Sequence, residues 1–278
     1  MKLNQSLSAL LAGAAIAPTL ILSLSTAAVA QTVKKVGDVA REVTVLIRRD
    51  RGPEGLRVAS GAIVARDGNT YAVLTAGHAV RQAGEYQVRT EDKQTYAVGR
   101  DRITILPGVD LAIIEFSSDR PYPVAKLANS DAADVGQTVF VVGWVVLGDI
   151  DRGGQFVRQI ADGGISGFLD APWEGYRISY TNVTSPGMNG GPVFDLGGRI
   201  IAMHGFGDNQ DPARLGIGTS APATTQPIKY DRRSDFGFAI PINTFLQQAA
   251  QAKLNLNLQV DNSPAPALSS ASGVSFEF

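Results

Sequence analysis

The sequence Gly187-Met188-Asn189-Gly190-Gly191-Pro192-Val193 places three glycines within five positions, immediately before a predicted β-strand. Glycine adopts positive φ values readily, so the successive N–H groups of such a stretch can turn toward one concavity. A concavity of this kind binds an anion, and it can stabilise the oxyanion that forms during acyl transfer. Taken alone, a glycine-rich stretch is usually just an ordinary turn.

A candidate general base follows a β-rich run in the first half of the chain. Residues 71–76 end in small side chains and lead directly into Gly77 and His78. A histidine that accepts a hydroxyl proton must be rigidly held and exposed on one side, and small neighbours leave room for a substrate. The alternative is a strand-end histidine without a chemical role, because a short motif stays a hypothesis until its context is known.

A candidate partner for this histidine is Asp110, which opens the apolar run 111–116. Its carboxylate is therefore expected at the edge of a core, where a charge must be paired or hydrogen-bonded. An imidazole N–H is a suitable donor, and the pairing would fix the tautomer of the histidine. The alternative is an ordinary turn or strand cap.

Together, and in this order, the three motifs resemble the trypsin-like (chymotrypsin-fold) serine protease superfamily. The order histidine, aspartate, nucleophile loop is that of chymotrypsin and differs from the orders in subtilisin and the α/β-hydrolases. The resemblance covers residues 43–246 and is of the bacterial secreted type, close to cysteine-free peptidases and glutamyl-endopeptidase-like proteins. It implies an all-β fold of two packed antiparallel β-barrels with a C-terminal helix and a site in the cleft between the barrels.

The resemblance also implies a role for each motif. His78 would be the general base, Asp110 would orient it, and the N–H groups of Gly187 and residue 189 would form the oxyanion hole. The family pattern is Gly-x-Ser-Gly-Gly-Pro, whereas this chain carries Asn189 at the position of the nucleophilic serine. Ser185 does not replace the missing serine, because it lies before Pro186 and would not project from the anion-binding concavity of the glycine-rich stretch, here called the nest.

Asparagine is not a usable nucleophile toward peptides, because its amide nitrogen lone pair is delocalised into the carbonyl. Loss of the nucleophile leaves a residual acceleration of about 10³ to 10⁴ over water from the oxyanion hole and binding. The dipeptide Asn189-Gly190 is also of the type most prone to deamidation.

Four explanations of Asn189 stay open. The one we favour is a natural pseudoprotease that binds a peptide or a protein partner in the former active-site cleft. The second is an active serine endopeptidase, working through an acyl-enzyme, of which this sequence is an inactive variant. Deliberate inactivation and a decaying fold are the remaining two.

His204 and Gly205 lie on the run that follows the nest. In the family this strand forms one wall of the primary specificity pocket, and a histidine there resembles the glutamyl endopeptidases, where it helps to hold an acidic side chain. The alternative is a histidine that only caps the pocket strand. Two distant histidines and no cysteine give no local ligand spacing, so we expect neither a metal nor a cofactor.

The pattern of short β-rich runs divides the chain into five parts. Residues 1–30, with a basic start, an apolar stretch and an Ala28-Val29-Ala30 site, are predicted to be a cleaved signal peptide, an uncleaved anchor being the alternative. A helical arm over 31–42 is followed by a first barrel over 43–125 and a second barrel with its helix over 126–256, where Asn243 is a plausible helix cap. Residues 257–278, rich in Pro, Ala and Ser, are predicted to be disordered, and 207–233 to be an insertion rimming the cleft.

Charge and cysteine content restrict the partners. The chain carries 25 basic and 26 acidic residues and has a net charge of −1, so it lacks the basic field that nucleic acid or an anionic membrane requires. The absence of cysteine in an exported chain fits a bacterial envelope, so we expect a periplasmic or extracellular protein. The expected partner is a peptide or protein, with no nucleic acid and no membrane after signal cleavage, and the expected state is a monomer.

Overall fold

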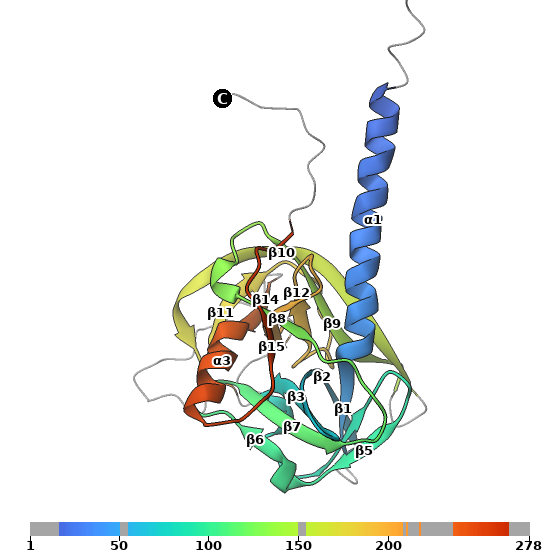
Figure 1. The fold of residues 1–278 in the computed structure, drawn as a ribbon. Helices are drawn as coiled ribbons and strands as arrows, with labels where there is room; N and C mark the ends of the chain where they lie inside the picture. Colours follow the sequence, from blue (N-terminus) through green and yellow to red (C-terminus); the bar gives the residue numbers. More distant parts are fainter. Residues whose placement is uncertain are drawn as a thin grey trace, which may run out of the picture.

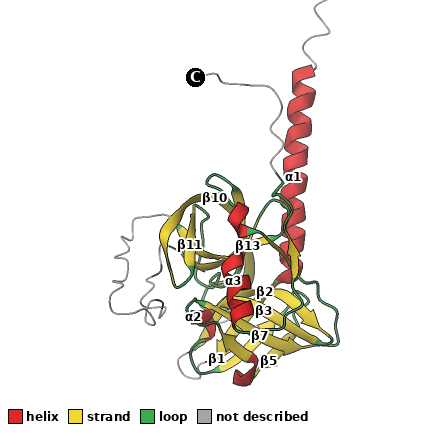
Figure 2. Ribbon diagram, turned by 60° about the vertical axis from the view of Figure 1, so that its left-hand side comes forward, coloured by secondary structure: helices red, strands yellow, loops and turns green. Residues whose placement is uncertain are grey.

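The computed structural model describes residues 17–50, 55–149, 154–207, 210, 217 and 236–266. β-Strands dominate, and they form two sheets that curl into two adjacent barrels (Figure 1, Figure 2). Helix α1 (Ala17–Val43) stands away from the barrels over much of its length, and α3 (Ile242–Gln251) packs against the second barrel. The predicted all-β fold of two packed barrels with a C-terminal helix is confirmed.

The first barrel is an antiparallel sheet of seven strands in the order β5-β4-β1-β2-β3-β7-β6. Its strands are β1 (Thr44–Asp50), β2 (Leu56–Asp67), β3 (Thr70–Ala76), β4 (Glu85–Arg89), β5 (Thr95–Val98), β6 (Ile103–Ile105) and β7 (Leu111–Ser117). Gly68 and Asn69 form the turn of the β2–β3 hairpin. Between β3 and β4 lies the one-turn helix α2 (Gly77–Val80), which carries His78.

The second barrel is an eight-stranded sheet in the order β12-β9-β10-β11-β14-β13-β8-β15. Its strands are β8 (Lys126–Ala128), β9 (Thr138–Leu147), β10 (Gln155–Trp173), β11 (Tyr176–Tyr180), β12 (Pro192–Phe194), β13 (Ile200–Phe206), β14 (Gly237–Pro241) and β15 (Gln259–Asp261). Because β12 pairs with both β9 and β13, six of these strands close a barrel, and β8 and β15 extend it by parallel pairing.

The buried side chains form three clusters, and one of them joins the two barrels. One cluster fills the first barrel around Ile47 and Val73, and another fills the second around Val141 and Tyr180. The third and largest lies between the barrels and combines residues of both with Val36 of α1 and Phe245 of α3. The cleft is therefore formed by two bodies that share one apolar interface.

Helix α1 differs from the predicted arm in where it begins. It ends at Val43, as the predicted arm nearly does, but it starts at Ala17 rather than near residue 31, because the Ala- and Leu-rich stretch continues the helix toward the N-terminus. Val36, Ala40 and Val43 lie on one face and are buried in the shared core. None of the described helices combines the length and the apolar character that a membrane crossing requires. Residues 1–16 lie outside the described part, and the signal peptide stays a prediction.

The predicted disorder from residue 257 onward is wrong for its first part. Gln259–Asp261 form β15, which pairs in parallel with β8, and Ser263 accepts a 2.6 Å hydrogen bond from Arg199. Residues 267–278 lie outside the described residues, as do all but Gly207, Gln210 and Ile217 of the predicted insertion.

One helix boundary also differs from the prediction. Asn243 is not the helix cap: Pro241 holds that position, and the Asn243 amide donates to Asn129 Oδ1 (2.7 Å). Strand β10 runs without interruption through Gly163 to Trp173, and Gly163 marks a close approach rather than a turn. A Cβ there would lie 2.5 Å from Asn182 Oδ1.

Candidate active site

His78 and Asp110 are joined by both backbone and side-chain hydrogen bonds. His78 lies on α2, directly after β3, and Asp110 directly precedes β7, the neighbour of β3 in the sheet. The backbone N–H of His78 donates to Asp110 Oδ1 (2.7 Å), and His78 Nδ1 lies 2.6 Å from Asp110 Oδ2. The pairing of neighbouring strands therefore places the two side chains together, as the sequence predicts.

The Asp110 carboxylate is fully buried and has two further polar neighbours. Tyr176, on β11 of the second barrel, donates its hydroxyl to Oδ2 (2.6 Å), and Arg81 Nη2 lies 3.4 Å from Oδ1. Burial raises the pKa of this carboxyl, but attraction to His78 and the hydrogen bonds from His78 and Tyr176 outweigh it, so the pKa lies below its usual value. Burial and the nearby carboxylate hold the pKa of Tyr176 well above its usual value, so the phenol stays a donor. Tyr176 was not among the predicted site residues, because nothing in the local sequence links it to Asp110.

Asn189 approaches the opposite nitrogen of the imidazole. Its Nδ2 lies 3.1 Å from His78 Nε2, its side chain is buried, and its Oδ1 has no hydrogen-bond partner among the described residues. The structure thus brings His78, Asp110 and Asn189 into one row, with the histidine in the middle.

The glycines of the loop have the backbone conformation that the sequence predicts. Gly187 and Gly190 have φ values of 103° and 79°, in the region that favours glycine. Within the described chain, the N–H groups of Gly187 and Asn189 have no backbone acceptor, whereas Gly190 N donates to His204 O (2.7 Å) and Gly191 N to Met188 O (2.8 Å). Two N–H groups beside His78 are therefore available to an oxygen atom of a ligand.

Ser60 of the first barrel holds this loop in place. Its hydroxyl donates to Gly187 O (2.8 Å) and accepts from Trp144 N (2.7 Å), and its own N–H donates to Asn189 O (2.9 Å). Serine is common in strands and turns, so no sequence signal marks Ser60 for this role.

Residues 59–203, about half of the chain, match the family described as the trypsin-like peptidase domain. The chain belongs to this family. It is also similar to the "Probable periplasmic serine endoprotease DegP-like" of Chlamydia trachomatis, with 28% identity over 174 residues that cover 59% of this chain and 31% of the relative. The "Serine protease Do-like HtrA" of Bacillus subtilis is 26% identical over 175 residues, covering 61% of this chain and 38% of that protein. The chain thus spans about a third of the length of these relatives.

Within this trypsin-like peptidase domain, His204 and Gly205 lie in the interior of the second barrel on β13. His204 is buried, its Nδ1 is hydrogen-bonded to the Tyr180 hydroxyl, and its Nε2 has no partner in the part of the chain that is described. Burial and repulsion from His78 lower the pKa of His204 to about 3, so it is uncharged at neutral pH. A Cβ at Gly205 would lie 2.0 Å from Tyr176 Cε1, so this glycine makes room for the tyrosine that reaches Asp110.

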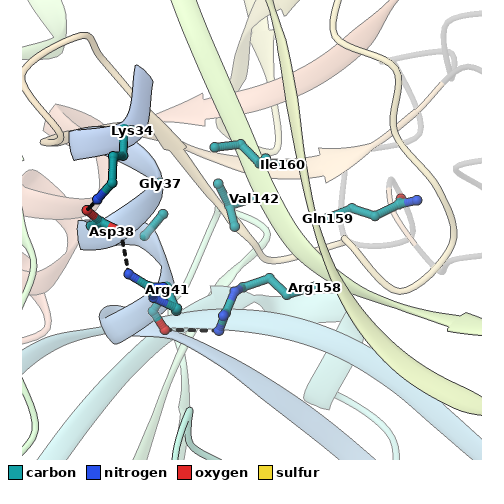
Figure 3. Close-up of a pocket in the computed structure, with 9 residues that line it drawn as sticks. Lys34, Gly37, Asp38, Arg41, Val142, Arg158, Gln159 and Ile160 are labelled. Carbon is teal, nitrogen blue, oxygen red and sulfur yellow. Dashed lines mark hydrogen bonds and ion pairs between the residues drawn. The ribbon is translucent and has the colours of Figure 1, made fainter. Parts of the chain in front are cut away.

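Two cavities lie beside the domain's strands. The larger, about 610 Å³, is lined by His78, Gly187 and Asn189 together with residues of β1 and β2, and by neither His204 nor Gly205. The smaller, about 290 Å³, lies between α1 and strands β9 and β10 (Figure 3). Its charged side chains bind one another or the backbone, as in Lys34–Asp38 (2.6 Å) and Arg158 to Arg41 O (2.9 Å). This smaller cavity is therefore a gap in the packing of α1 against the two strands. Among the described residues, no three His, Asp or Glu side chains gather as a metal ligand set.

Proposed function

We propose that this protein is a trypsin-like serine protease homologue in which Asn189 stands at the position of the nucleophile, and that it binds a peptide or protein segment in the cleft without cleaving it. The observation that carries the proposal is the 3.1 Å contact between Asn189 Nδ2 and His78 Nε2. In an active member of the family, the nucleophile hydroxyl would donate to this nitrogen.

The chemistry of the contact supports binding rather than cleavage. An amide nitrogen can only donate a hydrogen bond, so it occupies the acceptor of the imidazole and offers no hydroxyl to deprotonate. The N–H groups of Gly187 and Asn189 are still present, and they can donate hydrogen bonds to the carbonyl oxygen of a bound peptide as they would to an oxyanion.

We also propose that the protein is exported to the periplasm. Several of the similar proteins, among them those from Chlamydia trachomatis and Marinomonas, are named periplasmic. Processing after Ala30 would leave residues 31–43 of α1, which include the buried Val36, Ala40 and Val43, so the shared core would stay intact.

The test starts from the full chain expressed in a bacterial host. We expect it in the periplasmic fraction with Gln31 as its N-terminus. We expect it to resist labelling by a fluorophosphonate probe and to leave casein intact. Asn189→Ser should be labelled and should gain about 10³-fold or more in casein cleavage, since the nucleophile supplies most of the acceleration. Adding His78→Ala to Asn189→Ser should abolish labelling, which controls for non-specific reaction.

Labelling of the unmodified chain at residue 189 or elsewhere in the cleft would contradict the proposal. The competing function, an active endopeptidase of which this chain is an inactive variant, is favoured by the intact His78–Asp110 contact of 2.6 Å. It would be supported if Asn189→Ser cleaved casein and the unmodified chain bound no peptide at all.

A further inference from the structure

The larger cavity beside His78 and Asn189 has an arginine-rich wall. Arg49 on β1 and Arg57 on β2 both line it, and no Asp or Glu is among its described lining residues. Its other polar side chains are amides and the imidazole of His78, and none of them neutralises a guanidinium. The cavity therefore carries two positive charges next to the loop that would hold a peptide carbonyl.

The two arginines are cross-strand neighbours on the same face of the sheet. Arg49 and Arg57 are direct partners in the β1–β2 register, two residues beyond the pair Ile47 and Ala59, so their side chains leave the same face of the sheet. Like charges directly opposite each other destabilise an antiparallel pair. Neither arginine forms an ion pair with any described residue.

Arg49 in addition has an unsatisfied donor. It is 7% exposed, its Nη1 donates to Gln82 Oε1 (2.7 Å), and its buried Nε has no hydrogen-bond partner in the described chain. A guanidinium is always charged, and a buried donor without an acceptor is costly. Like-charge repulsion and a missing acceptor at the same place both indicate that an anion completes this wall.

We propose that the cavity binds a carboxylate of the peptide that lies in the cleft. This inference rests on the proposed function and adds to it the class of ligand: a peptide with an acidic group close to the residue whose carbonyl lies in the Gly187–Asn189 nest. The planar guanidinium matches a carboxylate through two parallel hydrogen bonds. The carboxylate can come from an Asp or Glu side chain or from the carboxyl terminus of the peptide.

The experiment is an affinity selection of random short peptides on the full chain. Two synthetic libraries are used, one amidated and one with free carboxyl ends, and bound peptides are identified by mass spectrometry. Arg57→Gln is the test variant, because Arg57 is exposed and we expect the substitution to leave the fold intact. Arg66→Gln is the matched control: it removes the same charge from the same strand at an exposed position outside the cavity.

We expect the unmodified chain and Arg66→Gln to select acidic peptides, and Arg57→Gln to lose this preference. For a selected peptide, Glu→Gln should weaken binding to the unmodified chain by about three- to tenfold, and added salt should reduce the difference. Preference in the amidated library assigns the carboxylate to a side chain, and preference confined to the free-ended library assigns it to the terminus. Either result supports the proposal.

Two different results would overturn the proposed carboxylate site. If peptides are selected without acidic preference, or if Arg57→Gln retains the preference, the carboxylate site is wrong and peptide binding stands. If neither library yields a bound peptide, the proposed function fails and this inference fails with it.

Discussion

At the scale of single residues, the contact between Asn189 and His78 determines the tautomer of the histidine. Asn189 Nδ2 can only donate, so His78 Nε2 accepts, and the ring proton is on Nδ1, facing Asp110 Oδ2 at 2.6 Å. This is the tautomer that a general base has before it accepts a proton from a nucleophile. Asn189 and Asp110 therefore contact opposite nitrogens of the same neutral imidazole.

The same loop geometry predicts that Asn189 resists deamidation, although the dipeptide Asn-Gly favours it. Deamidation requires the nitrogen of Gly190 to attack the Asn189 side-chain carbon, and this N–H is held by His204 O at 2.7 Å. The loop must open first, so we expect the reaction to be about tenfold slower or more in the folded protein. Peptide mass spectrometry after prolonged incubation, with the urea-unfolded chain as control, measures the difference. Equal rates in the folded and unfolded chains would contradict it.

Tyr176→Phe should destabilise the protein by removing the hydroxyl that donates to Asp110 Oδ2. A hydrogen bond to a charged group contributes about 1.5–3 kcal/mol, so the free energy of unfolding at neutral pH should fall by that amount. Urea denaturation measures it. Tyr86→Phe is the matched control, because the buried Tyr86 hydroxyl donates to a neutral carbonyl, Gln82 O (2.6 Å), and its loss should cost only about 1 kcal/mol. A smaller effect at Tyr176 than at Tyr86 would show that Asp110 does not depend on the Tyr176 hydroxyl.

At the scale of elements, most strands could be predicted from the sequence, but β8 and β15 could not. The runs over β3 and β7 stay apolar long enough to identify a strand. β8 and β15 have three residues each, and each depends on a partner more than a hundred residues away, so no local pattern reveals them. The need for glycine at position 163 could not be predicted either, because it comes from the close approach of the Asn182 side chain and not from the conformation of a turn.

The segment around β15 should be part of the stable fold. Arg199 is buried, pairs with Asp195 (2.7 Å), and uses its Nη1 to bind Asp261 Oδ1 (3.3 Å) and the Ser263 carbonyl (2.6 Å). Ending the chain after Leu256 should lower the free energy of unfolding by about 2–5 kcal/mol, because a buried charge loses partners and β8 loses a neighbour. Ending it after Pro266 is the matched control and should change little, since these contacts lie upstream. Equal stability of the two truncated chains by urea denaturation would contradict this role for β15.

At the scale of the whole molecule, the site exists because two barrels meet. Ser60 of the first barrel bonds the backbone of Gly187 and Trp144 in the second, and Tyr176 of the second bonds Asp110 of the first. The sequence singles out His78, Asp110 and the glycine loop as candidates, because each lies in a local pattern tied to its chemistry. It does not identify Ser60, Tyr176 or Arg49, because their importance comes from contacts across the interface or across the sheet.

The stability of the whole molecule should depend on pH through His204, which lies in the interior of the second barrel. The pKa of His204 is about 3 in the folded state and 6.5 in the unfolded state, so below pH 6.5 the unfolded chain binds a proton that the folded protein does not. The stabilisation is complete above pH 6.5 and falls by about 1.4 kcal/mol per pH unit as the pH drops toward 3. Asp110, whose pKa is lowered from 3.8, contributes in the same direction only below about that value, so the interval between 6.5 and 3.8 reports on His204.

Urea denaturation at several pH values in this interval, on the unmodified chain and on His204→Gln, measures the effect. Glutamine stays polar toward Tyr180 and does not titrate, so the variant should lose most of the pH slope even if it is less stable at neutral pH. If both proteins lose stability equally as the pH falls, the dependence comes from other groups, and His204 does not enter the folded barrel as the neutral imidazole that its burial requires.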